Sequence, residues 1–290
     1  MELKINAKLN INSTYKLANG VEIPVIGFGT WQTPDGDVAE AAVLDALKAG
    51  YRHIDTAAIY KNEEGVGRGI AKSKIAREEL FITTKIWNGM HTYEDAAGAL
   101  AESLEKLGLD YVDLYLIHWP NPLSARENWQ KRNQEIWRYM EDALEAGLVR
   151  SIGISNFHDH HITSLLETAK VVPHVNQIQL SPSEMQPEVV AANDKYGILS
   201  QAYSPLGTGT ILEVPELVQI AQKHGKTTAQ VAIRWSLQKG YNPLPKSVTT
   251  SRIIENIDVF DFELTEEEIK TIEGLSGCGK VASNPDDREF

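Results

Sequence analysis

Short apolar runs alternate along this chain with longer segments in which apolar residues recur every three or four positions. A run of about four to eight apolar residues between turn signals is typical of a buried strand, whereas the longer spacing indicates one face of a helix. The alternation begins at Val25 and predicts eight strands, at 25–28, 53–54, 80–84, 113–117, 149–154, 175–179, 198–202 and 242–245. The predicted helices are 36–49, 63–70, 93–107, 127–146, 160–168, 187–196, 216–225, 229–239 and 251–259.

Eight consecutive strand–helix units predict an α/β protein, and we expect a closed (β/α)8 TIM barrel. An open doubly wound sheet that binds a dinucleotide carries a glycine fingerprint directly after its first strand. The glycine-rich stretches 27–29 and 65–69 lack the length or the context of that fingerprint. The repeating pattern therefore favours the barrel.

The residues before the first repeat predict a hairpin. Asn19-Gly20 is a turn signal between the short runs 14–17 and 21–23, so we expect an N-terminal segment, residues 1–24, with a β-hairpin cap. No linker, charge block or low-complexity stretch interrupts the chain after it. We therefore expect residues 1–290 to form a single barrel domain.

Composition narrows the class of partner and the compartment. The formal net charge is −12 and the pI about 5.2, which argues against binding to nucleic acid or to an anionic membrane surface. Cys278 is the only cysteine, so no intrachain disulfide can form, and no apolar run has the length of a membrane span or signal peptide. We expect a cytoplasmic protein.

Polar residues stand at the ends of three predicted strands. Asp55, Lys85 and His118 each follow an apolar run, and the carboxyl ends of parallel barrel strands converge. Lys85 should lower the pKa of the nearby Tyr60 phenol below its usual value of about 10 and make it a proton donor. Asp55 would hold the ammonium, and a neutral His118 would hydrogen-bond a substrate oxygen. Such an acid can protonate the alkoxide that forms when a carbonyl accepts a hydride.

Two other interpretations remain open for these residues. Asp55 and Lys85 could be a structural ion pair. Asp55 and His118 could be metal ligands of a barrel hydrolase, although Lys85 beside them would repel a cation. We predict no metal.

Three stretches of the chain resemble a known family. They are GYRHIDTAAIY at 50–60, RSIGISNF at 150–157 and LPKS at 244–247 with the polar residues of the following helix. In order and spacing they resemble the aldo-keto reductases, from about Val25 onward, and bacterial diketogluconate and glyoxal reductases in particular. The resemblance implies a monomeric, NADPH-dependent (β/α)8 enzyme that reduces small aldehydes, ketones or dicarbonyls. An alternative within the same fold is a cofactor-binding regulatory subunit with little turnover, which the complete set of catalytic-type residues disfavours.

The resemblance also implies a role for each site residue. Asp55, Tyr60, Lys85 and His118 match the catalytic tetrad, with Tyr60 as general acid. The cofactor NADPH (NADP+) would be bound at its nicotinamide by Ser155, Asn156, Gln177 and Tyr203, at its pyrophosphate by Ser204 and Leu206, and at its adenosine by Lys246, Ser247, Arg252, Glu255 and Asn256. Substrate would lie against Trp31, Trp87, His118 and Trp119. Ser155 or Asn156 could instead cap the following helix.

Overall fold

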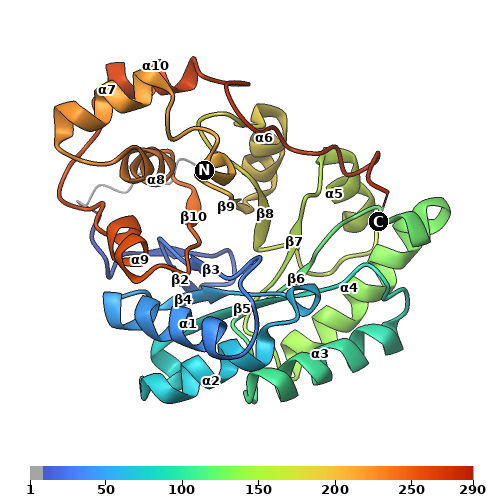
Figure 1. Cartoon of the computed structure of the whole chain (residues 1–290). Coiled ribbons are helices and arrows are strands. Elements are labelled where there is room, and N and C mark those ends of the chain that lie inside the picture. The colour runs from blue at the N-terminus through green and yellow to red at the C-terminus, as the bar shows by residue number, and fades with distance from the viewer. Residues whose placement is uncertain (1–8, 290) are drawn as a thin grey trace.

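The computed structural model describes residues 9–289 and contains one sheet of eight parallel strands that follow one another in chain order (Figure 1). Residues 1–8 of the expected N-terminal segment lie outside the described part of the chain. The strands are β3 (Phe28–Gly29), β4 (His53–Asp55), β5 (Phe81–Ile86), β6 (Leu114–Ile117), β7 (Ile152–Ser155), β8 (Val175–Gln179), β9 (Leu199–Tyr203) and β10 (Asn242–Leu244).

The first and last strands of this sheet meet. The backbone N–H groups of Gly27 and Gly29 donate to the carbonyl oxygens of Pro243 and Pro245, each at 3.0 Å. A Cβ at position 27 would lie 2.5 Å from the side chains of both His53 and Leu244, so these side chains would have to move to accommodate it. The strands therefore form the near-barrel that the eight-fold pattern predicts, and the (β/α)8 fold is confirmed.

Helices surround the outside of the sheet (Figure 1). They are α1 (Asp37–Ala49), α2 (Glu63–Ser73), α3 (Tyr93–Leu107), α4 (Trp129–Glu145), α5 (Asp159–Leu166), α6 (Pro187–Tyr196), α7 (Pro215–His224), α8 (Thr228–Gln238), α9 (Thr250–Ile257) and α10 (Glu266–Glu273), with a 3-10 turn η1 (Ala58–Tyr60) after β4. Among the described residues, no helix has the length and apolar character needed to cross a membrane.

The helix α10 was not predicted. Its start carries a signal that the sequence-based prediction did not use. The Thr265 hydroxyl accepts from the backbone N–H of Glu268, whose carboxylate accepts from the Thr265 N–H in return. This is a capping box, and its Thr-x-x-Glu spacing can be read from sequence.

The predicted hairpin is present at the amino end of the barrel. Strands β1 (Thr14–Lys16) and β2 (Glu22–Pro24) pair in antiparallel register, and Gly20 in the turn has a φ of 87° that favours glycine. The hydroxyl of Tyr15 donates to the backbone carbonyl of Tyr241 at 3.1 Å, directly before β10 begins. The hairpin therefore covers the end of the barrel opposite to the carboxyl ends of the strands.

Candidate active site

Asp55, Lys85 and His118 at the strand ends and Tyr60 in the turn η1 lie together at the carboxyl end of the barrel. The Lys85 Nζ lies 2.6 Å from Asp55 Oδ1 and 3.4 Å from the Tyr60 hydroxyl. It also donates to the Thr56 carbonyl oxygen at 2.8 Å. The Tyr60 and His118 rings meet edge to face with centroids 5.8 Å apart. The structure thus brings a buried acid, a buried amine and a buried imidazole together with a partly exposed phenol.

Burial dominates the electrostatics of this cluster. Burial raises the pKa of Asp55 and lowers that of Lys85, while their mutual attraction opposes both shifts. Lys85 also donates to the Thr56 carbonyl oxygen, and Asp55 also accepts from the Gln177 amide. These hydrogen bonds stabilise both charges, so the pair is ionised. Burial, with help from the Lys85 charge, holds the pKa of His118 well below its usual value, so this imidazole is neutral near pH 7.

The phenol of Tyr60 differs from the sequence-based prediction. Burial and the negative charge of Asp55 raise the pKa of Tyr60 well above 10. The prediction that Lys85 lowers this pKa is therefore wrong for this site, because the prediction considered one neighbouring cation and neglected desolvation and the carboxylate beside it. Tyr60 keeps its proton at neutral pH and can still give it to a stronger base such as an alkoxide.

A ladder of polar side chains crosses the barrel interior beneath the cluster. Gln177 Nε2 donates to Asp55 Oδ2 at 2.7 Å and to Gln201 Oε1 at 2.6 Å. Gln201 in turn donates to Asn242 Oδ1 at 2.7 Å. Gln177, Gln201 and Asn242 are register partners on β8, β9 and β10, so they stand side by side. Sequence reasoning missed Gln201 and Asn242, although a polar residue inside each of two apolar strands was a usable signal.

A second polar group adjoins the cluster. The Tyr203 hydroxyl donates to Asn156 Oδ1 at 2.9 Å, and Asn156 Nδ2 donates to the His118 carbonyl at 3.0 Å. The Ser155 hydroxyl donates to the Gln177 carbonyl at 2.7 Å. The alternative that Ser155 or Asn156 caps the next helix is wrong, since α5 begins after His158 and neither side chain bonds to its first turn.

One cavity of about 830 Å³ joins the cluster to the start of α9. All eleven residues that the resemblance assigns to the cofactor line it, as do Tyr60, His118 and the three tryptophans. Ser204 has a φ of 49°, a left-handed conformation that is rare for a residue with a side chain and often marks a functional loop. The cavity thus brings together residues from β4, β8, β9 and α9.

The C-terminal segment adds lining residues that the sequence did not predict. Lys280, Ser283 and Arg288 all line the cavity, together with Gln179 at the end of β8. The segment contains no helix or strand, so neither apolar periodicity nor a strand end could place these residues.

A parallel (β/α)8 barrel with a charged cluster at the carboxyl ends of its strands defines the class of the barrel enzymes. Comparison with known proteins makes this specific: the chain belongs to the aldo/keto reductase family, whose model matches residues 25–276. It is 47% identical to the glyoxal reductase of Bacillus subtilis over 281 residues, which cover 97% of this chain and 99% of that protein. It is 46% identical to the methylglyoxal reductase DkgA of Yersinia pestis, covering 91% of this chain and 93% of that one.

The structure also resembles that of the Bombyx mori aldo-keto reductase in complex with NADP. The TM-score is 0.85 at 38% identity, with 94% of this chain and 95% of that chain covered. The identification of the chain as an aldo-keto reductase from its sequence motifs is therefore confirmed.

Proposed function

We propose that this protein is an NADPH-dependent reductase that converts the carbonyl group of small aldehydes, ketones or dicarbonyls to an alcohol by hydride transfer. The observation that carries the proposal is the 3.4 Å distance from the Tyr60 hydroxyl to Lys85 Nζ, which forms a buried ion pair with Asp55. The names of its relatives, a glyoxal reductase and a methylglyoxal reductase, support dicarbonyls among the substrates.

The four clustered residues divide the proton chemistry among them. His118, neutral and buried, orients the substrate oxygen by a hydrogen bond. Tyr60 gives its proton to that oxygen as negative charge develops on it. The Lys85 ammonium then stabilises the phenolate, and Asp55 holds the ammonium in place. Bound NADPH supplies the hydride for this reaction.

The residues around the cavity fit a nicotinamide dinucleotide phosphate. Gln177 uses its amide nitrogen for Asp55 and Gln201, which leaves its carbonyl oxygen to accept from a carboxamide. Tyr203 lines the cavity and offers a ring for stacking. At the start of α9, Lys246 and Arg252 bring positive charge to a helix N-terminus, which suits a phosphate in a protein of net charge −12.

Substitution of Arg252 should separate the two nicotinamide cofactors. Arg252→Ala should raise the Kd for NADPH by about 10- to 100-fold, since a charge-assisted hydrogen bond contributes about 1.5–3 kcal/mol. The Kd for NADH should change by less than about threefold, because NADH lacks the 2′-phosphate that Arg252 is proposed to bind. Fluorescence titration of both cofactors measures this, and equal weakening of both would contradict the phosphate assignment.

A direct assay distinguishes the reductase from the regulatory alternative. Purified protein with methylglyoxal or an aromatic aldehyde should oxidise NADPH steadily, with an alcohol as the product. A protein that binds NADPH tightly but turns over none of a panel of aldehydes, ketones and dicarbonyls would instead be a cofactor-binding subunit.

We further infer that the protein acts on small molecules as a cytoplasmic monomer. The single cysteine, Cys278, is exposed, which suits a reducing compartment. The net charge of −12 disfavours nucleic acid as a partner.

A further inference from the structure

Arg132, near the start of α4, is a buried cation that the proposed reaction does not use. It is 3% exposed, and burial lowers its pKa to about 10, so the guanidinium stays protonated at neutral pH. Within residues 9–289, no carboxylate forms an ion pair with it. Burial of a charge without a counter-ion costs free energy unless its donors are satisfied, so the partners of these donors show what Arg132 does.

The guanidinium of Arg132 donates to backbone carbonyl oxygens of two loops. Its Nε donates to the Met90 carbonyl at 2.9 Å, in the loop after β5, and its Nη1 donates to the Trp119 carbonyl at 3.0 Å, in the loop after β6. Its Nη2 lies 3.5 Å from the Trp87 carbonyl oxygen. One planar group with donors on several sides thus ties together the loops that follow two adjacent strands.

Asn133, the next residue of α4, extends this contact. Its Nδ2 donates to the Pro120 carbonyl oxygen at 2.9 Å, and its Oδ1 accepts from Arg132 Nη1 at 3.0 Å. Asn133 is buried as well. The carbonyl groups of Trp119 and Pro120 are therefore both held from α4, by two side chains that also hold each other.

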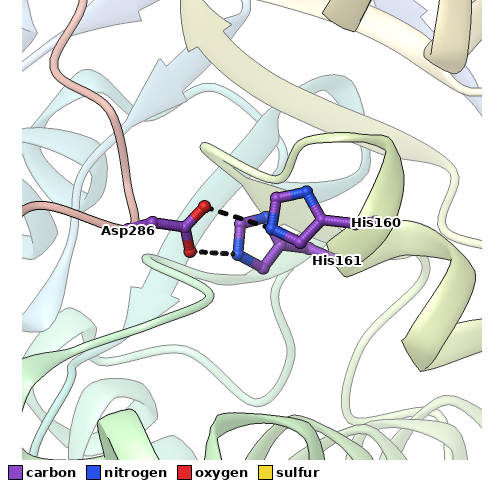
Figure 2. A group of neighbouring side chains, drawn as sticks. All are labelled: His160, His161 and Asp286. Carbon is purple, nitrogen blue, oxygen red and sulfur yellow. Dashed lines mark hydrogen bonds and ion pairs between the residues drawn. The ribbon is translucent and has the colours of Figure 1, made fainter.

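The loop after β6 is also held from its other side, by the C-terminal segment (Figure 2). Asn121 Nδ2 donates to Asp286 Oδ1 at 2.8 Å. The same carboxylate lies 3.0 Å from His161 Nε2 and 3.1 Å from His160 Nε2, and Figure 2 shows both imidazoles directed toward it. Asp286 thus connects this loop to α5.

The hydrogen bonds of this second contact favour a structural role over a metal site. His161 Nδ1 lies 3.2 Å from the backbone N–H of His158 and accepts from it. The proton of a neutral His161 is then on Nε2, where it is donated to Asp286. A histidine that binds a metal through one nitrogen normally donates a hydrogen from the other, which this geometry prevents.

The two loops that Arg132 connects carry two tryptophans of the cavity. Trp87 and Trp119 both line it, together with His118. The Trp87 ring meets the His118 ring edge to face, with centroids 5.1 Å apart. A shift of either loop would therefore move the surface against which a substrate lies.

The position of His118 itself depends on other contacts. Its backbone N–H donates to the Ile86 carbonyl at 3.3 Å, and its carbonyl accepts from Asn156 Nδ2 at 3.0 Å. Both partners belong to the barrel strands or their ends. Loss of Arg132 should therefore disturb the tryptophans and leave the imidazole in place.

We propose that Arg132 is a positioning residue that fixes Trp87 and Trp119 for the binding of large carbonyl substrates. The inference rests on the proposed reductase function and names a residue that sets its substrate preference. Without the guanidinium, the Met90 and Trp119 carbonyl groups lose a buried donor, and the loops shift to satisfy these oxygens elsewhere. A site whose supporting residues are removed loses precision in the residues that touch the substrate.

Two aldehydes of different size test this. Para-nitrobenzaldehyde presents an aromatic ring to the tryptophans, whereas methylglyoxal is too small to depend on both. Arg132→Met should lower the ratio of kcat/KM for para-nitrobenzaldehyde to that for methylglyoxal by about tenfold or more, chiefly through KM, because small errors of position are costly. Damage that only reduces the amount of folded protein lowers kcat for both aldehydes equally and leaves the ratio unchanged.

The control is Arg138→Met, which makes the same substitution on the exposed side of α4 and should keep the wild-type ratio. Arg132→Lys keeps the charge without the planar fork and should give an intermediate ratio. Arg132→Gln keeps one amide donor group and should lower the ratio by at least about threefold. This variant decides the question if Arg132→Met does not fold.

The outcomes separate the two proposals. If the folded Arg132→Met or Arg132→Gln protein has the wild-type ratio, the positioning role is overturned and the reductase function stands. If the wild-type protein reduces neither aldehyde, nor any other carbonyl compound, with NADPH, the proposed function itself fails.

Discussion

Tyr60→Phe should lower kcat for carbonyl reduction by about 10²- to 10⁴-fold, the usual contribution of a positioned general acid. The phenylalanine ring keeps the edge-to-face contact with His118, so the packing of the site changes little. What is lost is the only phenolic proton within 3.4 Å of the Lys85 ammonium in the described structure. The alkoxide would then have to take its proton from water in a buried site, where that transfer is slow.

Two further measurements show whether the loss of kcat comes from the missing general acid. The Kd for NADPH, from fluorescence titration, should be unchanged, since the hydroxyl of Tyr60 has no part in the proposed cofactor contacts. Tyr196→Phe serves as a matched control, because among residues 9–289 its hydroxyl bonds to Lys195 and Thr163 on the outer surface, and its loss should leave kcat intact. A Tyr60→Phe variant that retains kcat within about threefold of wild type would remove the general-acid role.

Much of the site could be predicted because barrel topology converts order along the chain into proximity. Asp55 and Lys85 are thirty residues apart, yet Asp55 is the last residue of β4 and Lys85 the last but one of β5, and adjacent parallel strands end at the same rim. Periodicity was enough to find those ends. The boundaries were less accurate where strands are short: β3 was expected at 25–28 and is Phe28–Gly29, because its pairing with β4 begins only at Phe28.

What could not be predicted depends on contacts between segments distant in sequence. Asp286 meets His161 across 125 positions, and no local pattern in an irregular segment indicates such a pairing. The predicted direction of the pKa shift at Tyr60 was wrong for a related reason. The shift is the sum of desolvation and the effects of several charges. The sequence indicates which residues lie near a strand end, but it does not show how deeply they are buried.

Lys85→Met should affect both catalysis and folding. A unit charge about 4 Å from a developing phenolate contributes roughly 4 kcal/mol at an effective dielectric constant near 20, and Asp55 offsets part of it. We therefore expect kcat to fall by about 10²- to 10³-fold. The substitution also leaves the buried Asp55 carboxylate without its cation, which should lower the free energy of unfolding by about 3–5 kcal/mol at neutral pH. Urea denaturation and steady-state kinetics measure the two effects separately.

The pH dependence of that stability loss identifies its cause. Burial already raises the pKa of Asp55 and Lys85 opposes the rise, so without Lys85 the folded-state pKa should increase further. A folded pKa above the unfolded value of about 3.9 means that the folded state holds a proton the unfolded state has released. Stability of Lys85→Met should therefore be greatest in acid and fall as pH rises from about 4 toward the folded-state pKa.

The double variant Lys85→Met with Asp55→Asn separates structure from chemistry. An uncharged amide at position 55 can still accept from Gln177 and has no charge to desolvate, so stability should recover toward wild type and lose the new pH dependence. Activity should stay low, because no ammonium remains to stabilise the phenolate. Recovery of activity along with stability would mean that the ion pair only supports the fold, and that protonation of the product does not depend on Lys85.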